Sequence, residues 1–153
     1  MIKKNDLRIG DWVFFYAGYD KEESHNDTVR AIGEQYGGDS IFLDCCGGDP
    51  IYENELFPIV LTKEIAERNG FHSAGFTQLY RVFDQPERRV TWDYSSHLLV
   101  ITRDDSTFER RKRKTMLSMF CDDVHHFQHL LKETGIDVEL KITDSDDIDW
   151  SQV

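Results

Sequence analysis

Turn signals divide the first 60 residues of this sequence into short segments, and this spacing limits what they can fold into. Gly37–Asp39 and Gly47–Pro50 are typical of tight turns, because glycine adopts the positive φ angles that such turns require. Trp12–Tyr16 is rich in residues that favour a half-buried strand, and short apolar segments lie on either side of the turns. We therefore predict that residues 1–61 form an SH3-like small β-barrel. Its strands are expected at residues 12–16, 28–36, 41–46 and 51–56, with a polar loop at residues 17–27.

Residues 62–142 predict a second, α+β unit that begins with a short helix. The hydroxyl of Thr62 can cap a helix over residues 63–69, and Gly70 stands where a helix commonly ends. An antiparallel meander is then expected from strands at residues 76–83, 89–94 and 97–102. Because Leu98–Ile101 is continuously apolar, we expect it to be a strand that is buried on both faces.

The strongest helix signal lies in residues 122–134, with Asp122 as the expected N-cap and Gly135 just past the end. Apolar residues recur there at spacings of three and four, which places them on one face: Val124, Phe127, Leu130 and Leu131. Residues 136–142 alternate between apolar and polar side chains, which predicts a final strand. Residues 143–153 form an acidic tail. The fold class expected for the whole chain is therefore α+β.

Composition and cysteine use bear on the compartment. The 153 residues are 39% hydrophobic and contain no apolar run of about 18 residues, so we predict a folded chain without a membrane span. Adjacent Cys45 and Cys46 cannot easily form a relaxed disulfide, and no secretory signal follows Met1. We therefore expect a cytoplasmic protein that needs no cofactor. Its oligomeric state stays open.

Charge is distributed unevenly along the chain. The net formal charge is −11, yet residues 61–121 carry 11 basic and 8 acidic side chains. The segments before and after them are each net −7, and these negative flanks argue against duplex nucleic acid as a partner. An anionic partner would bind the middle third, unless its bases simply pair with the acidic flanks.

The run of bases at residues 110–114 is the sharpest feature of this middle third. Guanidinium groups that share one face of an extended chain can hold phosphate oxygens through paired hydrogen bonds. The run precedes the helix at residues 122–134, whose imidazole and amide groups can add hydrogen bonds. For an anionic small molecule such as a nucleotide, the predicted ligand-binding residues are Arg110, Arg111, Arg113, Lys114, His125, Gln128 and His129. The alternatives are a protein-docking surface and a solvated loop or edge strand whose charges prevent aggregation.

Two histidines one helical turn apart, His125 and His129, can face one metal ion. With Cys121 as a third ligand they give an alternative hypothesis, a small metal-assisted hydrolase. The metalloprotease signature would place a glutamate directly after the first histidine, and here that residue is His126. The simpler interpretation is a polar helix face without a metal, and we predict none.

Three segments are similar to parts of a known group. Leu7–Val13, Leu56–Phe71 and Val124–Leu130, in this order, resemble small uncharacterised proteins encoded by phages and mobile elements of Bacteroidales-type gut bacteria. The last helix of that group often has His and Gln three residues apart, as His125 and Gln128 are here. The basic middle of this chain departs from the group. The resemblance implies a cytoplasmic, phage-like accessory protein and carries no activity.

Signatures of catalysis are missing from the sequence. It contains no nucleophile elbow, no P-loop and no kinase signature, so we predict no catalytic residues. The favoured hypothesis is a non-catalytic binding protein, such as a phage accessory or anti-defence protein that sequesters an anionic nucleotide-like ligand or masks a host protein. The metal-assisted hydrolase and a phage structural or assembly component are the alternatives.

Overall fold

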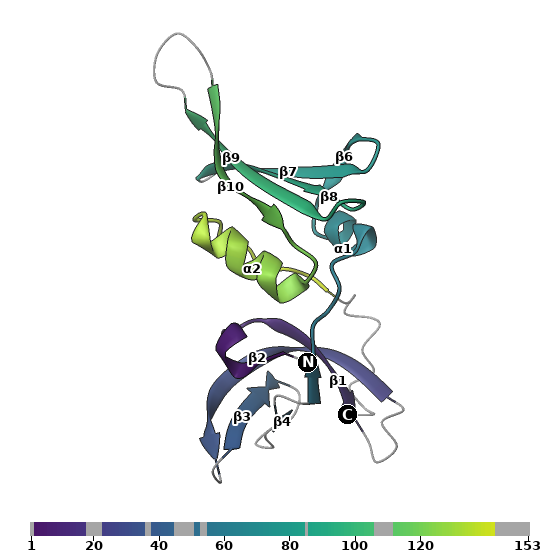
Figure 1. Ribbon diagram of the computed structural model, residues 1–153, viewed down its shortest axis with the longest axis vertical. Coiled ribbons are helices and arrows are strands. Elements are labelled where there is room, and N and C mark those ends of the chain that lie inside the picture. Colours follow the sequence, from purple (N-terminus) through teal and green to yellow (C-terminus); the bar gives the residue numbers. More distant parts are fainter. Residues whose placement is uncertain are drawn as a thin grey trace. The chain divides into compact units, whose positions relative to one another are not determined.

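The computed structural model describes residues 2–17, 23–35, 38–44, 51–52, 55–84, 86–105 and 112–142. It confirms the α+β class, with two antiparallel sheets and few helices (Figure 1). The described residues fall into two compact units. Of the described residues, the first unit contains those up to Val60 together with Asp123–His125 and Ile142, and the second contains those of Leu61–Asp122 and His126–Lys141.

The first unit is a five-stranded antiparallel sheet. A short 3-10 helix, η1, precedes strands whose order in the sheet is β4-β3-β2-β1-β5. The bounds are Lys4–Asp6 for η1, Trp12–Ala17 for β1, Glu23–Gln35 for β2, Gly38–Leu43 for β3, Ile51–Tyr52 for β4 and Leu56–Phe57 for β5. Within the described part of the chain β4 and β5 do not pair, so this sheet is not a closed barrel there.

One face of this sheet forms the first core. Val13 and Phe15 alternate along β1 with half-buried neighbours, and they pack with Val29, Ile41 and Leu43. The predicted loop at residues 17–27 is wrong at Ala17 and from Glu23 onward, because Ala17 belongs to β1 and residues 23–27 pair with β1 as the start of β2. Backbone hydrogen bonding to β1 holds this stretch in the sheet although its side chains are polar. Cys45, Cys46 and the turn at residues 47–50 lie outside the described residues.

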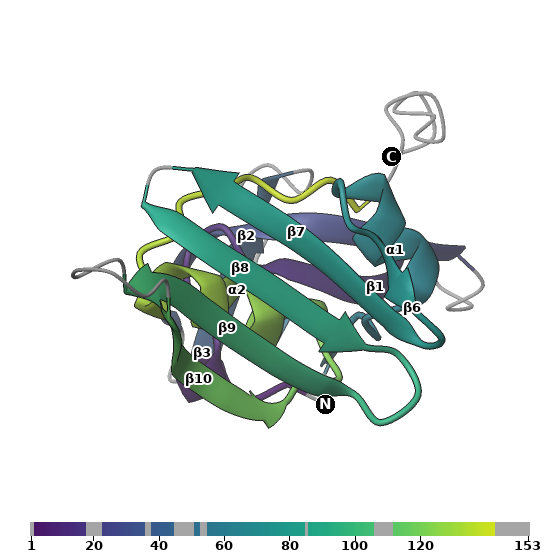
Figure 2. The same cartoon turned by 90° about the horizontal axis from the view of Figure 1, so that it is seen from above.

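The second unit contains the predicted meander, extended by one strand on each side. Its sheet has the order β10-β9-β8-β7-β6, and Figure 2 turns one face of this sheet to the viewer. The strand bounds are His72–Gly75 for β6, Gln78–Asp84 for β7, Glu87–Asp93 for β8, Leu98–Asp105 for β9 and Lys112–Phe120 for β10. The helices are α1, Lys63–Arg68, and α2, Val124–Glu133.

Helix α2 covers only one face of this sheet, as both views show (Figures 1 and 2). Leu99 and Ile101 of β9 are fully buried, whereas Leu98 and Val100 are only half-buried. The prediction that β9 is buried on both faces is therefore wrong. The predicted apolar face of α2 is confirmed, since its four members are all buried: Val124, Phe127, Leu130 and Leu131.

Both helices end in the same way, in a Schellman motif closed by a glycine. After α1, Gly70 has φ +82°, and the amide of buried Phe71 donates to the Ala66 carbonyl at 3.1 Å. After α2, Gly135 has φ +83°, and the amide of buried Ile136 donates to the Leu131 carbonyl at 2.9 Å. Thr62 caps the start of α1, because its hydroxyl accepts from the Ile65 amide at 3.2 Å. These predicted helix ends are confirmed.

The start of α2 differs from the prediction. The helix begins at Val124, and Asp122 is not part of its cap. The Asp122 carboxylate forms a hydrogen bond with Nδ1 of the His97 ring, and its backbone carbonyl accepts from the Leu61 amide at 2.7 Å. These two contacts hold Asp122 outside the helix.

The predicted final strand at residues 136–142 is also wrong. The alternation is correct, since Ile136 and Leu140 are buried between exposed neighbours, but no strand pairs with this segment in the described part of the chain. The side chain of Asn69 takes the place of a strand here. Its Oδ1 accepts from the Lys141 amide at 2.6 Å, and its Nδ2 donates to the Lys141 carbonyl at 2.7 Å. The acidic tail at residues 143–153 lies outside the described residues.

Arginines from the β7–β8 hairpin bind the C-terminal carbonyls of both helices. Arg81 Nη1 donates to the Asn69 carbonyl at 2.6 Å, and Arg88 Nε donates to the Thr134 carbonyl at 2.9 Å. Positive charge at a helix C-terminus opposes the negative end of the helix dipole. Two bases of the middle third therefore serve the fold. None of the described helices is both long and apolar enough to span a membrane.

Candidate binding surface

The structure describes only part of the predicted basic patch. Arg110 and Arg111 lie outside the described residues, whereas Arg113 and Lys114 are exposed on β10. Arg113 lies opposite Asp104 of β9, and Lys114 lies opposite Arg103. Because neighbouring residues of a strand point to opposite faces, these two bases do not converge on one ligand.

Protein carboxylates already neutralise part of this charge. Arg113 Nη2 lies 3.6 Å from Glu87 Oε1, and Arg113 Nη1 donates to the Thr102 hydroxyl at 3.4 Å. Both partners of the ion pair are solvent-accessible, so the pair adds little stability and water screens it. Arg113 is thus in contact with a carboxylate and a hydroxyl of its own sheet.

The other predicted binding residues lie in α2. His125 and His129 are buried in α2 and Gln128 is half-buried. Arg113 contacts Glu87, which neighbours Arg88, and Arg88 binds the C-terminal end of α2. His125 lies in the first turn of α2, at the opposite end of a helix about 15 Å long. The combination of the basic run with these residues of α2 therefore stays a prediction.

A different set of potential metal ligands lies together at the start of α2. Among the described residues, ligand atoms within 4.8 Å of one another occur in Asp123, His125 and His126. The predicted set of Cys121, His125 and His129 does not form such a group in the described part of the chain. The His126 and His129 rings lie edge to face, 6.2 Å apart. Three donors from one helical turn do not by themselves assign a metal site.

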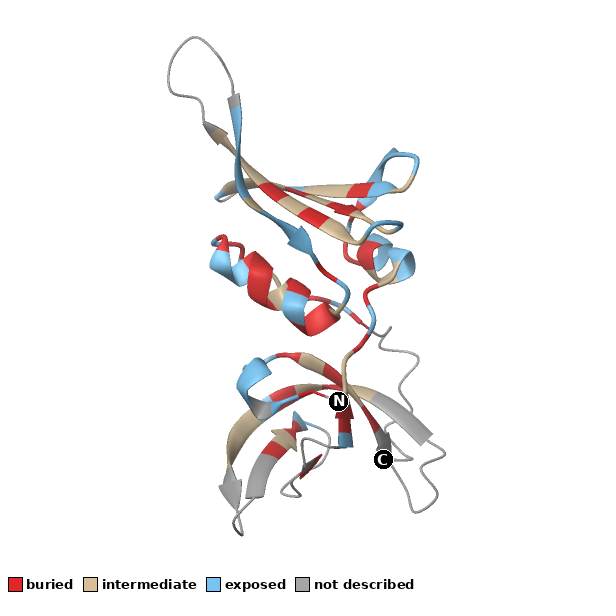
Figure 3. Ribbon diagram, viewed as in Figure 1, coloured by how far each residue is buried: buried red, intermediate tan, exposed pale blue. Residues whose placement is uncertain are grey.

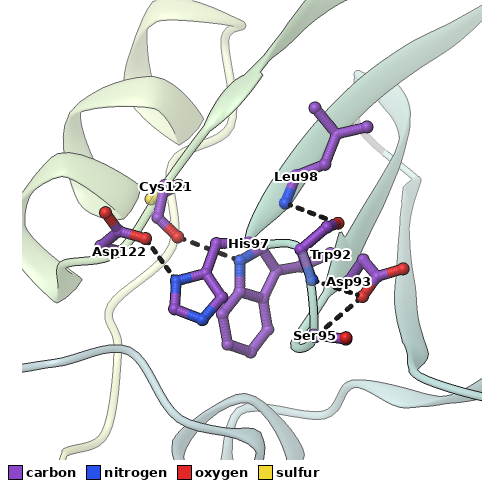
Figure 4. A network of polar contacts seen from close by, with 8 residues as sticks. Trp92, Asp93, Ser95, His97, Leu98, Cys121 and Asp122 are labelled. Carbon is purple, nitrogen blue, oxygen red and sulfur yellow. Dashed lines mark hydrogen bonds and ion pairs between the residues drawn. The ribbon is translucent and has the colours of Figure 1, made fainter.

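A polar network joins the β8–β9 turn to the end of β10 (Figure 4). Trp92 Nε1 donates to the Cys121 carbonyl at 3.1 Å, and the Cys121 amide donates to the His97 carbonyl at 2.8 Å. The His97 ring pairs with Asp122, and the buried Cys121 enters the network through its backbone. A cysteine, a histidine and an aspartate are therefore neighbours in one network that joins two ends of strands in the same sheet.

Asp93 organises the same turn. Its Oδ1 accepts from the backbone amides of Ser95 and Ser96 at 2.8 and 3.0 Å, and from the Thr77 hydroxyl at 3.0 Å. Backbone donation from Ser96, then Ser95, lowers the pKa of Asp93 below the ordinary value of an aspartate side chain. The carboxylate is thus held in its charged form by the turn that it shapes.

Strand β10 presents the most unusual surface of the second unit. It is the terminal strand of its sheet, and no strand in the described part of the chain pairs with its outer edge. Figure 3 shows it exposed along nearly its whole length. Three of its large apolar side chains are accessible, with exposed fractions of 38% for Met116, 46% for Met119 and 68% for Phe120.

The two halves of β10 differ. A β-bulge between Thr115 and Leu117 interrupts its pairing with β9. Residues 117–120 then pair in regular register with residues 98–101, and they carry no charge. From the sequence, the basic run at residues 110–114 is either a loop or an edge strand, and this half was missed because the bases dominated the pattern. The available signal was the apolar run that follows them: Met116, Leu117, Met119 and Phe120.

Comparison with known proteins adds no relative. No family model, no curated protein and no solved structure matches this chain.

Proposed function

We propose that this chain is a non-catalytic binding protein that receives an extended segment of a protein partner along the outer edge of β10. An edge strand offers a row of backbone N–H and C=O groups to an added strand, and such pairing is a common mode of peptide recognition. The observation that carries the proposal is the uncharged stretch Leu117–Phe120 at this edge, with Met119 and Phe120 accessible to solvent.

Edge strands that avoid pairing are usually short, bulged or charged. The first half of β10 has these protective features, since it carries bases and ends at the bulge beside Met116. The second half is neither bulged nor charged, and its regular register with β9 leaves it suitable for a further strand. This contrast favours a binding role for residues 117–120.

The contacts favour a protein partner over an anionic nucleotide-like ligand. Arg113 and Lys114 point to opposite faces, and Arg113 already contacts Glu87. A phosphate would need converging donors. We propose that the partner is a host protein that this chain masks. The resemblance to proteins of phages and mobile elements supports this choice of partner. We also propose that the first unit is an SH3-like module, which its antiparallel order β4-β3-β2-β1-β5 supports.

The test is a selection of random ten-residue peptides displayed on phage, followed by amide hydrogen exchange of the full chain with an enriched peptide. Binding through β10 predicts slower exchange of amides at residues 117–120. Phe120→Lys adds a charge to the edge and should abolish binding. Val82→Lys is the matched control, because Val82 is 42% exposed on β7, away from the edge, and this variant should bind normally.

Two outcomes would overturn the proposal. One is a selection that enriches no peptide. The other is an enriched peptide that protects amides elsewhere in the chain or binds the Phe120→Lys variant as well as the parent.

A further inference from the structure

Given the proposed function, we infer that the partner segment runs antiparallel to β10 and has the order apolar, any, apolar, any, acidic. The inference concerns the chemistry of the occupant, and it follows from which side chains share each face of the sheet. Every strand pair in both described sheets is antiparallel, so an added strand of the same direction continues the existing hydrogen-bond pattern.

The pairing with β9 shows which β10 residues face the core side. Leu117 and Met119 lie opposite Ile101 and Leu99, which are fully buried on the face that α2 covers. Side chains of paired residues lie about 5 Å apart on the same face. A partner strand on the other side of β10 would therefore place alternate side chains beside Met119 and Leu117, where apolar groups lose the most water. These are the two apolar positions of the inferred order.

The third position on the same face carries a pair of like charges, with no carboxylate paired to them among the described residues. Lys114 lies directly opposite Arg103 across the β10–β9 ladder. Like charges at directly opposed positions destabilise a sheet, and a carboxylate beside them relieves the repulsion. On the other face, Arg113 already has Asp104 opposite it and Glu87 within 3.6 Å. A carboxylate of the partner strand would therefore stabilise the complex most beside Lys114.

The spacing of the apolar and acidic positions in the partner segment follows from how β9 pairs with β10 across the bulge. Met119, Leu117 and Lys114 pair with Leu99, Ile101 and Arg103, which are every second residue of β9. A partner strand that spans the bulge as β9 does would place alternate residues at the same three levels. In the antiparallel direction the apolar positions come first and the acidic position last.

The experiment uses fluorescently labelled ten-residue peptides and anisotropy titration of the full chain. The test peptide has apolar residues at alternate positions followed by glutamate, and the controls are the same residues in reversed order and a peptide with lysine in place of glutamate. We expect the lysine peptide to bind about fivefold more weakly than the glutamate peptide, and the reversed peptide to lose binding.

A charge exchange gives the decisive comparison. In a Lys114→Glu variant the preference should invert, so that the lysine peptide binds more tightly than the glutamate peptide. Thr115→Glu is the matched control, because Thr115 is also exposed on β10 but lies on the opposite face, and the preference there should persist.

The outcomes separate the two proposals. If peptides slow amide exchange in β10 without any preference for glutamate or for the order, the inference fails and the proposed function stands. If no peptide protects β10, the proposed function fails. If the chain instead forms dimers by sedimentation that Phe120→Lys dissociates, the occupant is a second copy and the acidic partner is refuted.

Discussion

Replacing Asn69 by alanine should destabilise the second unit, because one buried amide connects α1 to the segment at residues 136–142. Its Nδ2 donates to the Ile65 carbonyl at 2.8 Å and to the Lys141 carbonyl at 2.7 Å, and its Oδ1 accepts from the Lys141 amide at 2.6 Å. Each such bond contributes about 1 kcal/mol net. The backbone at position 69, with φ −97° and ψ 23°, accepts alanine without strain.

The expected loss in the free energy of unfolding is about 2–3 kcal/mol, since three bonds disappear and the exposed Lys141 backbone regains some water. This loss can be measured by urea unfolding at neutral pH, monitored by tryptophan fluorescence, to which buried Trp92 contributes. Glu67→Ala is a suitable control, because it breaks only an exposed pair with Lys63 and should cost about 0.5 kcal/mol.

Asn69→Asp sharpens the test. Aspartate keeps the acceptor but places a carboxylate oxygen against two carbonyl oxygens, so it should destabilise at least as much as alanine. If Asn69→Ala loses less than about 1 kcal/mol with an unchanged urea slope, the view that this side chain replaces a strand is refuted.

Three further predictions concern helix ends and the β8–β9 turn. Gly135→Ala should lose about 1–2 kcal/mol because position 135 has φ +83°, whereas Gly33→Ala, in a β-strand, should not; equal urea midpoints would contradict this. Arg88→Gln should lose about 1 kcal/mol and speed amide exchange in the last turn of α2, and unchanged exchange would show that the Thr134 contact is dispensable. The lowered pKa of Asp93 means that its charged form contributes stability above about pH 4 and loses it as pH falls through the folded pKa. The stability gap between the parent and Asp93→Asn should thus shrink below pH 4 in urea titrations, and a constant gap would contradict the assignment.

Local chemistry made the helices and the meander predictable. Thr62, Gly70 and Gly135 act through their own backbone neighbours, so their roles could be inferred without the tertiary structure. The strand residues of β7–β9 have the propensity that a pleated sheet favours. These features depend on residues that are close in sequence.

The errors arose where a distant residue decided the outcome. Residues 136–142 have the alternation of a strand, but their backbone partner is the side chain of Asn69, 72 residues away from Lys141. Asp122 has the chemistry of an N-cap, but His97 binds it instead. No periodicity in the sequence could reveal either partner.

Contacts with residues that are distant in sequence also limited the prediction of the candidate site. The basic run and the histidine-bearing helix are close in sequence, yet the carboxylate that contacts Arg113 belongs to Glu87, on a different strand. Burial of His125 and His129 also depends on the packing of α2. The exposed apolar half of β10 could have been recognised from its composition, but its place at the edge of the sheet could not.

Arg81 and Arg88 of the β7–β8 hairpin bind the C-terminal ends of both helices, and this affects how the second unit unfolds. A six-residue helix such as α1 is too short to persist alone in water, so its lifetime depends on what holds it. Phe71, just after α1, meets Phe127 of α2 with ring centroids 5.7 Å apart, which links the two helices directly. We therefore expect α1, α2 and the β7–β8 hairpin to unfold together as one cooperative unit. The slowest-exchanging amides of the three elements should then have the same free energy of opening.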